Sequence, residues 1–177
     1  MQGAKDVKDR RFDKMISRKK CQYILMATIV LTICFIWGNS MMPRRISSSE
    51  SGRIVAVLHV LWDRLSVNYD TADHIVRKCA HFIEYANLGM QLDWLFAIRN
   101  SQQKTSKKYL NRDRITGFLS SPIARAANTT LLVALVDETI QIFSARGPQI
   151  QDVWLDLFGG MCGAAIAALI VKLFIPS

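Results

Sequence analysis

Residues 21–43 read CQYILMATIVLTICFIWGNSMMP and contain no formally charged side chain. An α-helix rises about 1.5 Å per residue, so this stretch is long enough to cross a hydrocarbon core about 30 Å thick. We therefore expect it to form a first membrane span. A cleaved signal peptide is the competing interpretation, but the preceding basic region is long and no small-x-small cleavage site follows Trp37.

Three further segments are expected to cross the membrane. They are residues 75–98, 123–143 and 153–174. Hydropathy alone predicts the last one, whereas the other two contain ionisable residues and are predicted from length and position. Residues 49–65 are too short and too polar to span, which favours an interfacial helix. The sequence thus predicts an all-α polytopic membrane bundle of about four transmembrane helices plus one interfacial helix.

The charge distribution predicts how this bundle is oriented. The 177-residue chain has a net charge of +9 and is 50% hydrophobic, a combination that suits lipid better than water. Residues 1–20 hold eight Lys or Arg and residues 99–122 hold six, whereas residues 39–74 hold only four. Cytoplasmic loops carry the excess of Lys and Arg, so both termini are expected to be cytoplasmic. We expect a basic cytoplasmic tail at residues 1–20, a transmembrane domain at residues 21–177, and no nucleic-acid partner.

Polar side chains gather at the non-cytoplasmic ends of three expected spans. The second span contributes Arg77, Lys78, His81, Glu84 and Tyr85; the third contributes Asp137, Glu138 and Gln141, followed by Arg146; the fourth contributes Asp152 and Asp156. Each set contains side chains three or four residues apart, such as Lys78, His81 and Tyr85, so each set can present a shared face to the bundle interior. A charge that faces lipid costs at least about 2.5 kcal/mol, which favours an arrangement pointing into the bundle.

This cluster has two interpretations. It could be a structural ion-pair network that fixes helix packing, or a functional site, because ionisable groups within a membrane are usually functional. In the functional case, the candidate catalytic residues are His81 as the proton-transfer group and Glu84, Asp137 and Glu138 as acids or bases. The remaining cluster residues, Arg77, Lys78, Tyr85, Gln141, Arg146, Asp152 and Asp156, would bind a ligand or complete the polar network.

The same residues raise two narrower expectations. The second span carries cations at its N-terminal end and the third carries anions at its C-terminal end, so each has charges that its own helix dipole disfavours. Pairing between the two ends would offset this cost, which predicts that Arg77 or Lys78 lies against Asp137 or Glu138. One His with several carboxylates could hold a divalent ion, but the sequence has no H-E-x-x-H motif. Metal binding is the weaker option, and no metal or other cofactor is expected.

Small residues dominate the fourth expected span. Gly159 and Gly163 form a G-x-x-x-G motif, which allows close approach of helix backbones. The motif could serve packing within the bundle or a homo-oligomer, and the sequence does not choose between these.

Four blocks of residues, in this order, resemble the VanZ family. They are residues 40–43, 77–89, 137–141 with Arg146, and 152–159. The family pattern usually has Asn where this chain has Asp156. The resemblance implies a bacterial cell-membrane protein of the cell envelope and, for the founding member, low-level antibiotic resistance to the glycopeptide teicoplanin. It implies no known reaction.

Three functions follow as hypotheses. The leading one is a VanZ-like envelope protein that lowers susceptibility to teicoplanin-type glycopeptides through its exoplasmic polar site. The second is a membrane-embedded enzyme acting on a lipid headgroup or a lipid-linked envelope precursor. The third is a small proton-linked transporter or a partner subunit. The expected partners are membrane lipids and either a glycopeptide antibiotic or a lipid-linked precursor.

Overall fold

Every regular element in the described part of the chain is a helix, which confirms the all-α class. The computed structural model describes residues 2–42, 44–106, 118–144 and 149–174. The helices are α1 (Gln2–Met41), α2 (Arg44–Val57), α3 (His59–Arg64), α4 (Tyr69–Ser106), α6 (Pro122–Phe143) and α7 (Ile150–Phe174).

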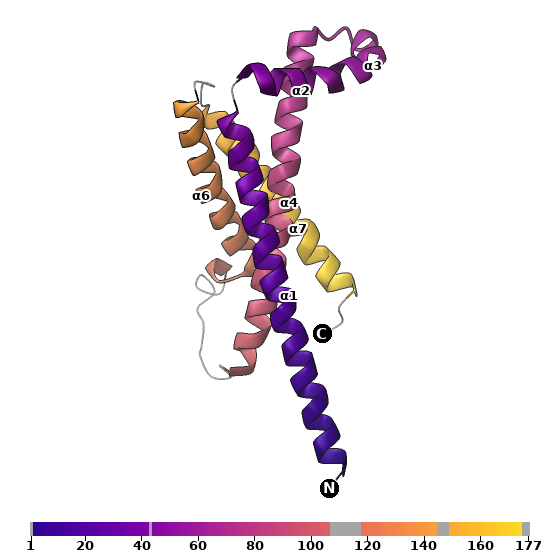
Figure 1. Ribbon diagram of the computed structural model, residues 1–177, viewed down its shortest axis with the longest axis vertical. Helices are drawn as coiled ribbons and strands as arrows, with labels where there is room; N and C mark the ends of the chain where they lie inside the picture. Colours follow the sequence, from indigo (N-terminus) through magenta and orange to yellow (C-terminus); the bar gives the residue numbers. More distant parts are fainter. Residues whose placement is uncertain (1, 43, 107–117, 145–148, 175–177) are drawn as a thin grey trace.

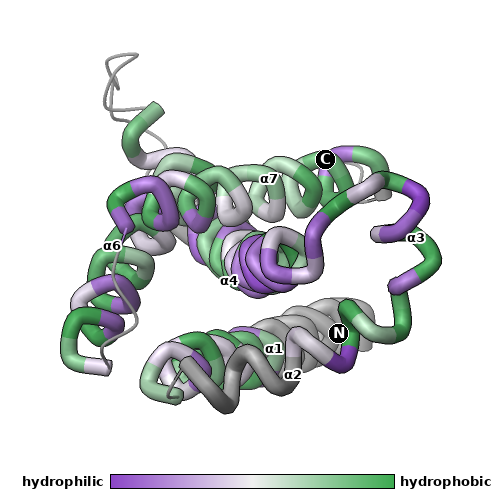
Figure 2. Tube along the Cα trace, turned by 90° about the horizontal axis from the view of Figure 1, so that it is seen from above, coloured by the Kyte–Doolittle hydropathy of each residue, from purple (hydrophilic) through white to green (hydrophobic). Residues whose placement is uncertain are grey.

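Four long helices form a bundle, and two short helices lie across one end of it. Helices α1, α4, α6 and α7 run along the long axis, while α2 and α3 cross the end at which α4 begins (Figure 1). Helix α4 lies between α7 and α1 (Figure 2) and packs most extensively against α7 and α6. Side chains that α4 directs inward can therefore meet residues from the other three long helices.

Glycines bring the backbones of α4 and α7 into close contact. A Cβ atom added to Gly159 would lie 2.6 Å from the carbonyl oxygen of Phe82, and one added to Gly163 would overlap the carbonyl of Ala86. On α4, Gly89 faces Gly160 in the same way. Both glycines of the G-x-x-x-G motif thus pack against α4 of their own chain, while a homo-oligomer through them stays a prediction.

Two of the expected spans have nearly the predicted bounds. The segment 123–143 corresponds to α6 and the segment 153–174 to α7. Helix α4 extends beyond the expected 75–98 at both ends, and α1 continues from the apolar stretch back through the basic tail to Gln2. The expected interfacial helix is divided into α2 and α3 at Leu58.

The apolar helices are consistent with a membrane protein. Among the described residues, Lys19–Met41 and Ile150–Leu173 are long and apolar enough to cross a bilayer. Helices α4 and α6 are not among these candidates, so the expected number of four spans is not confirmed. Large apolar side chains are nevertheless exposed along three of the long helices, as lipid contact would require: Leu31, Phe35, Leu132, Phe143, Phe158 and Leu169.

The short helices are attached to the first turns of α4. Val55 of α2 and Trp62 of α3 form a small apolar cluster with Ala72 of α4. The Ser51 hydroxyl of α2 donates a hydrogen bond to the Asp73 carboxylate of α4. Helices α2 and α3 are therefore held across the end of the bundle at which α4 begins, near Arg77, Lys78 and His81.

Candidate functional site

A small polar cavity lies where α4, α6 and α7 meet, near the end that carries α2 and α3. Its volume is about 70 Å³. The lining residues are His74, Arg77, Lys78 and His81 of α4, Glu138 and Gln141 of α6, and Gln149, Asp152, Leu155 and Asp156 at or within α7. The structure thus brings together residues from all three of the polar sets that the sequence singled out.

The cations of the cavity are paired in a different way from the one predicted. Lys78 Nζ lies 2.9 Å from Asp152 Oδ1 of α7, and Arg77 forms a 2.9 Å ion pair with Asp73, one turn earlier on α4. The prediction that Arg77 or Lys78 pairs with Asp137 or Glu138 of α6 was therefore wrong. Asp152 is favoured because it lies in the first turn of α7, where the helix dipole stabilises an anion.

Gln141 orients the two carboxylates of α6. Its Nε2 donates to Glu138 Oε1 at 3.0 Å and to Asp137 Oδ2 at 3.3 Å. Glu138 also accepts a 2.9 Å hydrogen bond from the backbone N–H of Gln149. Because these donors fix both carboxylates, Gln141 is a positioning residue and Glu138 is a hydrogen-bonded acceptor at the cavity wall.

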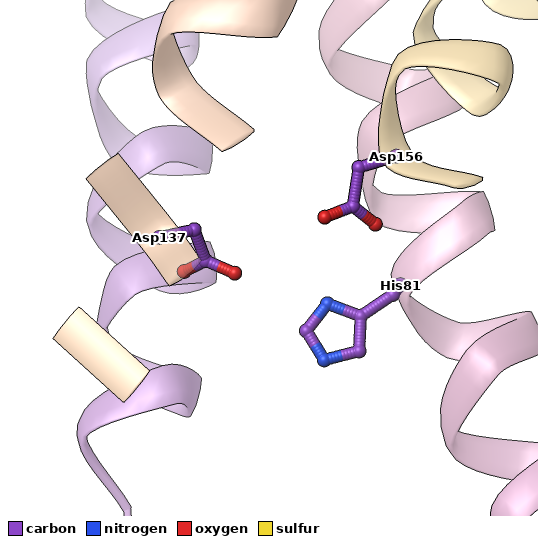
Figure 3. A group of neighbouring side chains, drawn as sticks. All are labelled: His81, Asp137 and Asp156. Carbon is purple, nitrogen blue, oxygen red and sulfur yellow. The ribbon is translucent and has the colours of Figure 1, made fainter. Parts of the chain in front are cut away.

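His81, Asp137 and Asp156 converge from three different helices. One ring nitrogen of His81 and one carboxylate oxygen of each aspartate lie within 4.8 Å of one another. The three side chains point toward a common centre (Figure 3). Asp137 and Asp156 are almost completely buried, whereas His81 is half-buried. This arrangement can exchange a proton or hold a cation.

The family comparison bears on this site. A family model described as VanZ/LLP1 matches residues 24–172, which include the whole described cluster. The chain belongs to the VanZ/LLP1 family. No curated protein and no solved structure matches it. Membership confirms the resemblance seen in the sequence motifs.

Two further motif residues of this VanZ/LLP1 chain lie beside the cavity. Glu84 is not among the lining residues and accepts a 3.0 Å hydrogen bond from Asn39 Nδ2 of α1. Tyr85 is fully buried, and its hydroxyl lies close enough to Asp137 and Asp156 to interact with their charges. Glu84 therefore connects α1 to the cluster, while Tyr85 is buried beside it.

The VanZ/LLP1 cluster also includes residues that the sequence did not single out. His74 lines the cavity, and its i, i+4, i+7 spacing with Lys78 and His81 could have revealed it. No sequence pattern pointed to Gln149 or Asn39. Each joins the cluster through a hydrogen bond to a residue of another helix, Gln149 to Glu138 and Asn39 to Glu84. The predicted cluster residue Arg146 lies outside the described residues.

Proposed function

We propose that the chain is a multi-pass protein of the bacterial cell membrane that lowers susceptibility to teicoplanin-type glycopeptides. In this proposal both termini are cytoplasmic, and the cavity opens toward the exoplasmic side. The observation that carries it is the polar cavity formed by α4, α6 and α7 within the segment that matches the family model. Exposed apolar side chains on the long helices and two candidate spans support the membrane location.

The size of the cavity limits what it could bind. A water molecule needs at least about 10–15 Å³ of such a cavity, so a volume of about 70 Å³ holds a few waters or a small polar group. A whole glycopeptide is excluded, whereas a carboxylate, a phosphate or an amine at the end of a larger ligand would fit. Lys78 and Arg77 would contact an anionic group, and the ion pairs that they form with Asp152 and Asp73 would have to rearrange.

Susceptibility measurements test the proposal. A sensitive bacterium would express the wild-type protein, His81→Ala or Glu138→Gln, with equal membrane abundance verified for each. We expect selective protection against teicoplanin over vancomycin, lost in both variants. Asp93→Asn is the matched control, because Asp93 is a buried carboxylate of α4 that does not line the cavity. If the wild type gives no protection, the resistance proposal is wrong.

A membrane-embedded enzyme is the second candidate function. The observation that favours it is the convergence of His81 with Asp137 and Asp156 at the cavity, because an imidazole beside carboxylates can act as an acid or a base. The substrate would be a lipid headgroup or a lipid-linked envelope precursor. Lipid mass spectrometry of cells expressing the wild type or His81→Ala tests it, and identical profiles would contradict it.

A further inference from the structure

We propose that His81, Asp137 and Asp156 form a binding site for one divalent transition-metal ion. The three residues come from α4, α6 and α7, and their potential ligand atoms lie within 4.8 Å of one another. Their side chains point toward one centre (Figure 3). The site goes beyond the proposed function, since it requires neither drug resistance nor lipid chemistry.

Asp156 provides the independent observation that points to a ligand. Its side chain is only 1% exposed, and its Oδ1 atom has no hydrogen-bond partner among the described residues. Figure 3 shows its carboxylate directed toward His81 and Asp137. Buried charges in proteins are normally paired or coordinate metals. A metal ion would supply the partner that Asp156 lacks.

The charge balance around Asp156 also favours a cation. Four other carboxylates are close enough to interact with its charge: Asp137, Glu138, Asp152 and Glu84. Of the Lys and Arg side chains that line the described cavity, Lys78 pairs with Asp152 and Arg77 pairs with Asp73. A divalent ion at the centre of the three side chains would compensate this excess of negative charge.

The donor set indicates the class of metal ion. Imidazole suits transition metals such as Zn²⁺, whereas Mg²⁺ and Ca²⁺ prefer sites made of oxygen atoms. Ligand atoms around a tetrahedral ion with bonds of about 2.1 Å lie roughly 3.4 Å apart, so the three side chains would close inward on binding. Three protein ligands leave a fourth position open for water, which is the pattern of catalytic zinc sites.

The surroundings of the site fit this assignment. Gln141 donates to Asp137 Oδ2 at 3.3 Å and would hold that ligand in place, as residues that hydrogen-bond to metal ligands do in other metal sites. His81 and Asp156 both line the cavity, which provides a route of entry. The open coordination position would face the space in which the end group of a ligand could bind.

Calorimetric titration of the purified full-length protein in detergent tests the proposal. After treatment with EDTA and its removal, the protein would be titrated separately with Zn²⁺, Mn²⁺, Mg²⁺ and Ca²⁺. We expect saturable binding of about one Zn²⁺ or Mn²⁺ per chain, weakened at least about tenfold by Asp137→Asn and by Asp156→Asn. Asp93→Asn should bind like the wild type.

Thermal unfolding provides a second measurement on the same samples. A ligand that binds only the folded state raises Tm, so a given Zn²⁺ concentration should raise Tm of the wild type and of Asp93→Asn more than that of Asp156→Asn. Without metal, Asp156→Asn should be at least as stable as the wild type, because a neutral amide of similar size replaces a buried acidic group that lies near other carboxylates. The proposal is overturned if no ion binds, if only Mg²⁺ and Ca²⁺ bind, or if both aspartate variants bind as the wild type does.

Discussion

Lys78 Nζ of α4 lies 2.9 Å from Asp152 Oδ1 of α7, and this ion pair joins the two helices at the rim of the cavity. The Lys78 side chain is 42% exposed and that of Asp152 is 29% exposed. Water therefore screens the pair, and exposed pairs of this kind contribute between about 0 and 1 kcal/mol. Its main effect is to fix where the Lys78 ammonium lies relative to the other cavity residues.

The first prediction is a weak coupling between Lys78 and Asp152. A double-mutant cycle with Lys78→Ala and Asp152→Ala should give a coupling free energy of about 0.5 kcal/mol, because the attraction is largely screened. Chemical unfolding of the purified protein in detergent measures it. The control pair is Lys78 with Asp93, for which the effects should add. A coupling above about 2 kcal/mol would show that the pair is buried in the membrane protein.

The second prediction concerns the contact between α4 and α7. Gly163→Ala should lower the free energy of unfolding by about 1–3 kcal/mol, because the added methyl group overlaps the backbone of Ala86 and forces the helices apart. The matched control is Gly38→Ala in α1, where an added Cβ has no neighbour within 4 Å. That substitution should be neutral or slightly stabilising, since Ala favours helix more than Gly does.

Gly163→Ala also distinguishes a role of this glycine in packing within one chain from a role in self-association. If Gly163 serves only the contact with α4, Gly163→Ala reduces stability without changing the oligomeric state in size-exclusion chromatography. Loss of a dimer at unchanged stability would instead assign the glycine to an interface between copies. An unfolding free energy equal to that of the wild type would contradict the close approach of α4 and α7.

The third prediction tests the orientation in the membrane. Single cysteines would be introduced as Asn68→Cys and Ser101→Cys after replacement of the four native cysteines by serine; both positions are exposed. With both termini cytoplasmic and four spans, position 68 is exoplasmic and position 101 is cytoplasmic. A membrane-impermeant maleimide should label the first in intact cells and the second only after lysis. Labelling of both in intact cells would contradict four spans.

The sequence predicted the parts of the structure that depend on local pattern. The apolar run of α7 gave nearly correct bounds from hydropathy, and those of α6 followed from the length and position of its segment. The spacing of Lys78, His81 and Tyr85 also predicted that α4 directs polar groups toward its neighbours. These properties are encoded within one helix at a time.

Features that depend on contacts between helices could not be predicted in the same way. The polar ends of α4 are helical without any apolar periodicity, so hydropathy did not reveal that it begins at Tyr69 and ends at Ser106. The partner of Lys78 was misassigned because Asp152 and Asp137 are both acidic and both lie near the same end of the bundle. The convergence of His81 with Asp156 depends on how α4 and α7 pack, which spacing within one helix does not determine.

The fourth prediction concerns how the short helices are held on α4. Trp62 of α3 is 7% exposed and packs with Val55 and Ala72. Trp62→Ala leaves a cavity of the kind that costs about 3–5 kcal/mol in a core, so α2 and α3 should open locally while the long helices remain folded. Ser51→Ala removes the hydroxyl that donates to Asp73 and should cost about 1 kcal/mol.

Hydrogen exchange measured by mass spectrometry distinguishes these outcomes. Peptides covering residues 51–66 should exchange much faster in Trp62→Ala and moderately faster in Ser51→Ala, whereas those of α7 should be unchanged. His59→Ala is the control, because His59 is exposed and its ring nitrogen lies 3.0 Å from the Ala56 carbonyl oxygen of its own segment. Faster exchange throughout α4 and α7 would show instead that the short helices are part of one cooperative unit with the bundle. In that case, a substitution in α3 would also disturb the cavity, and His81 variants would have to be interpreted together with the stability of α2 and α3.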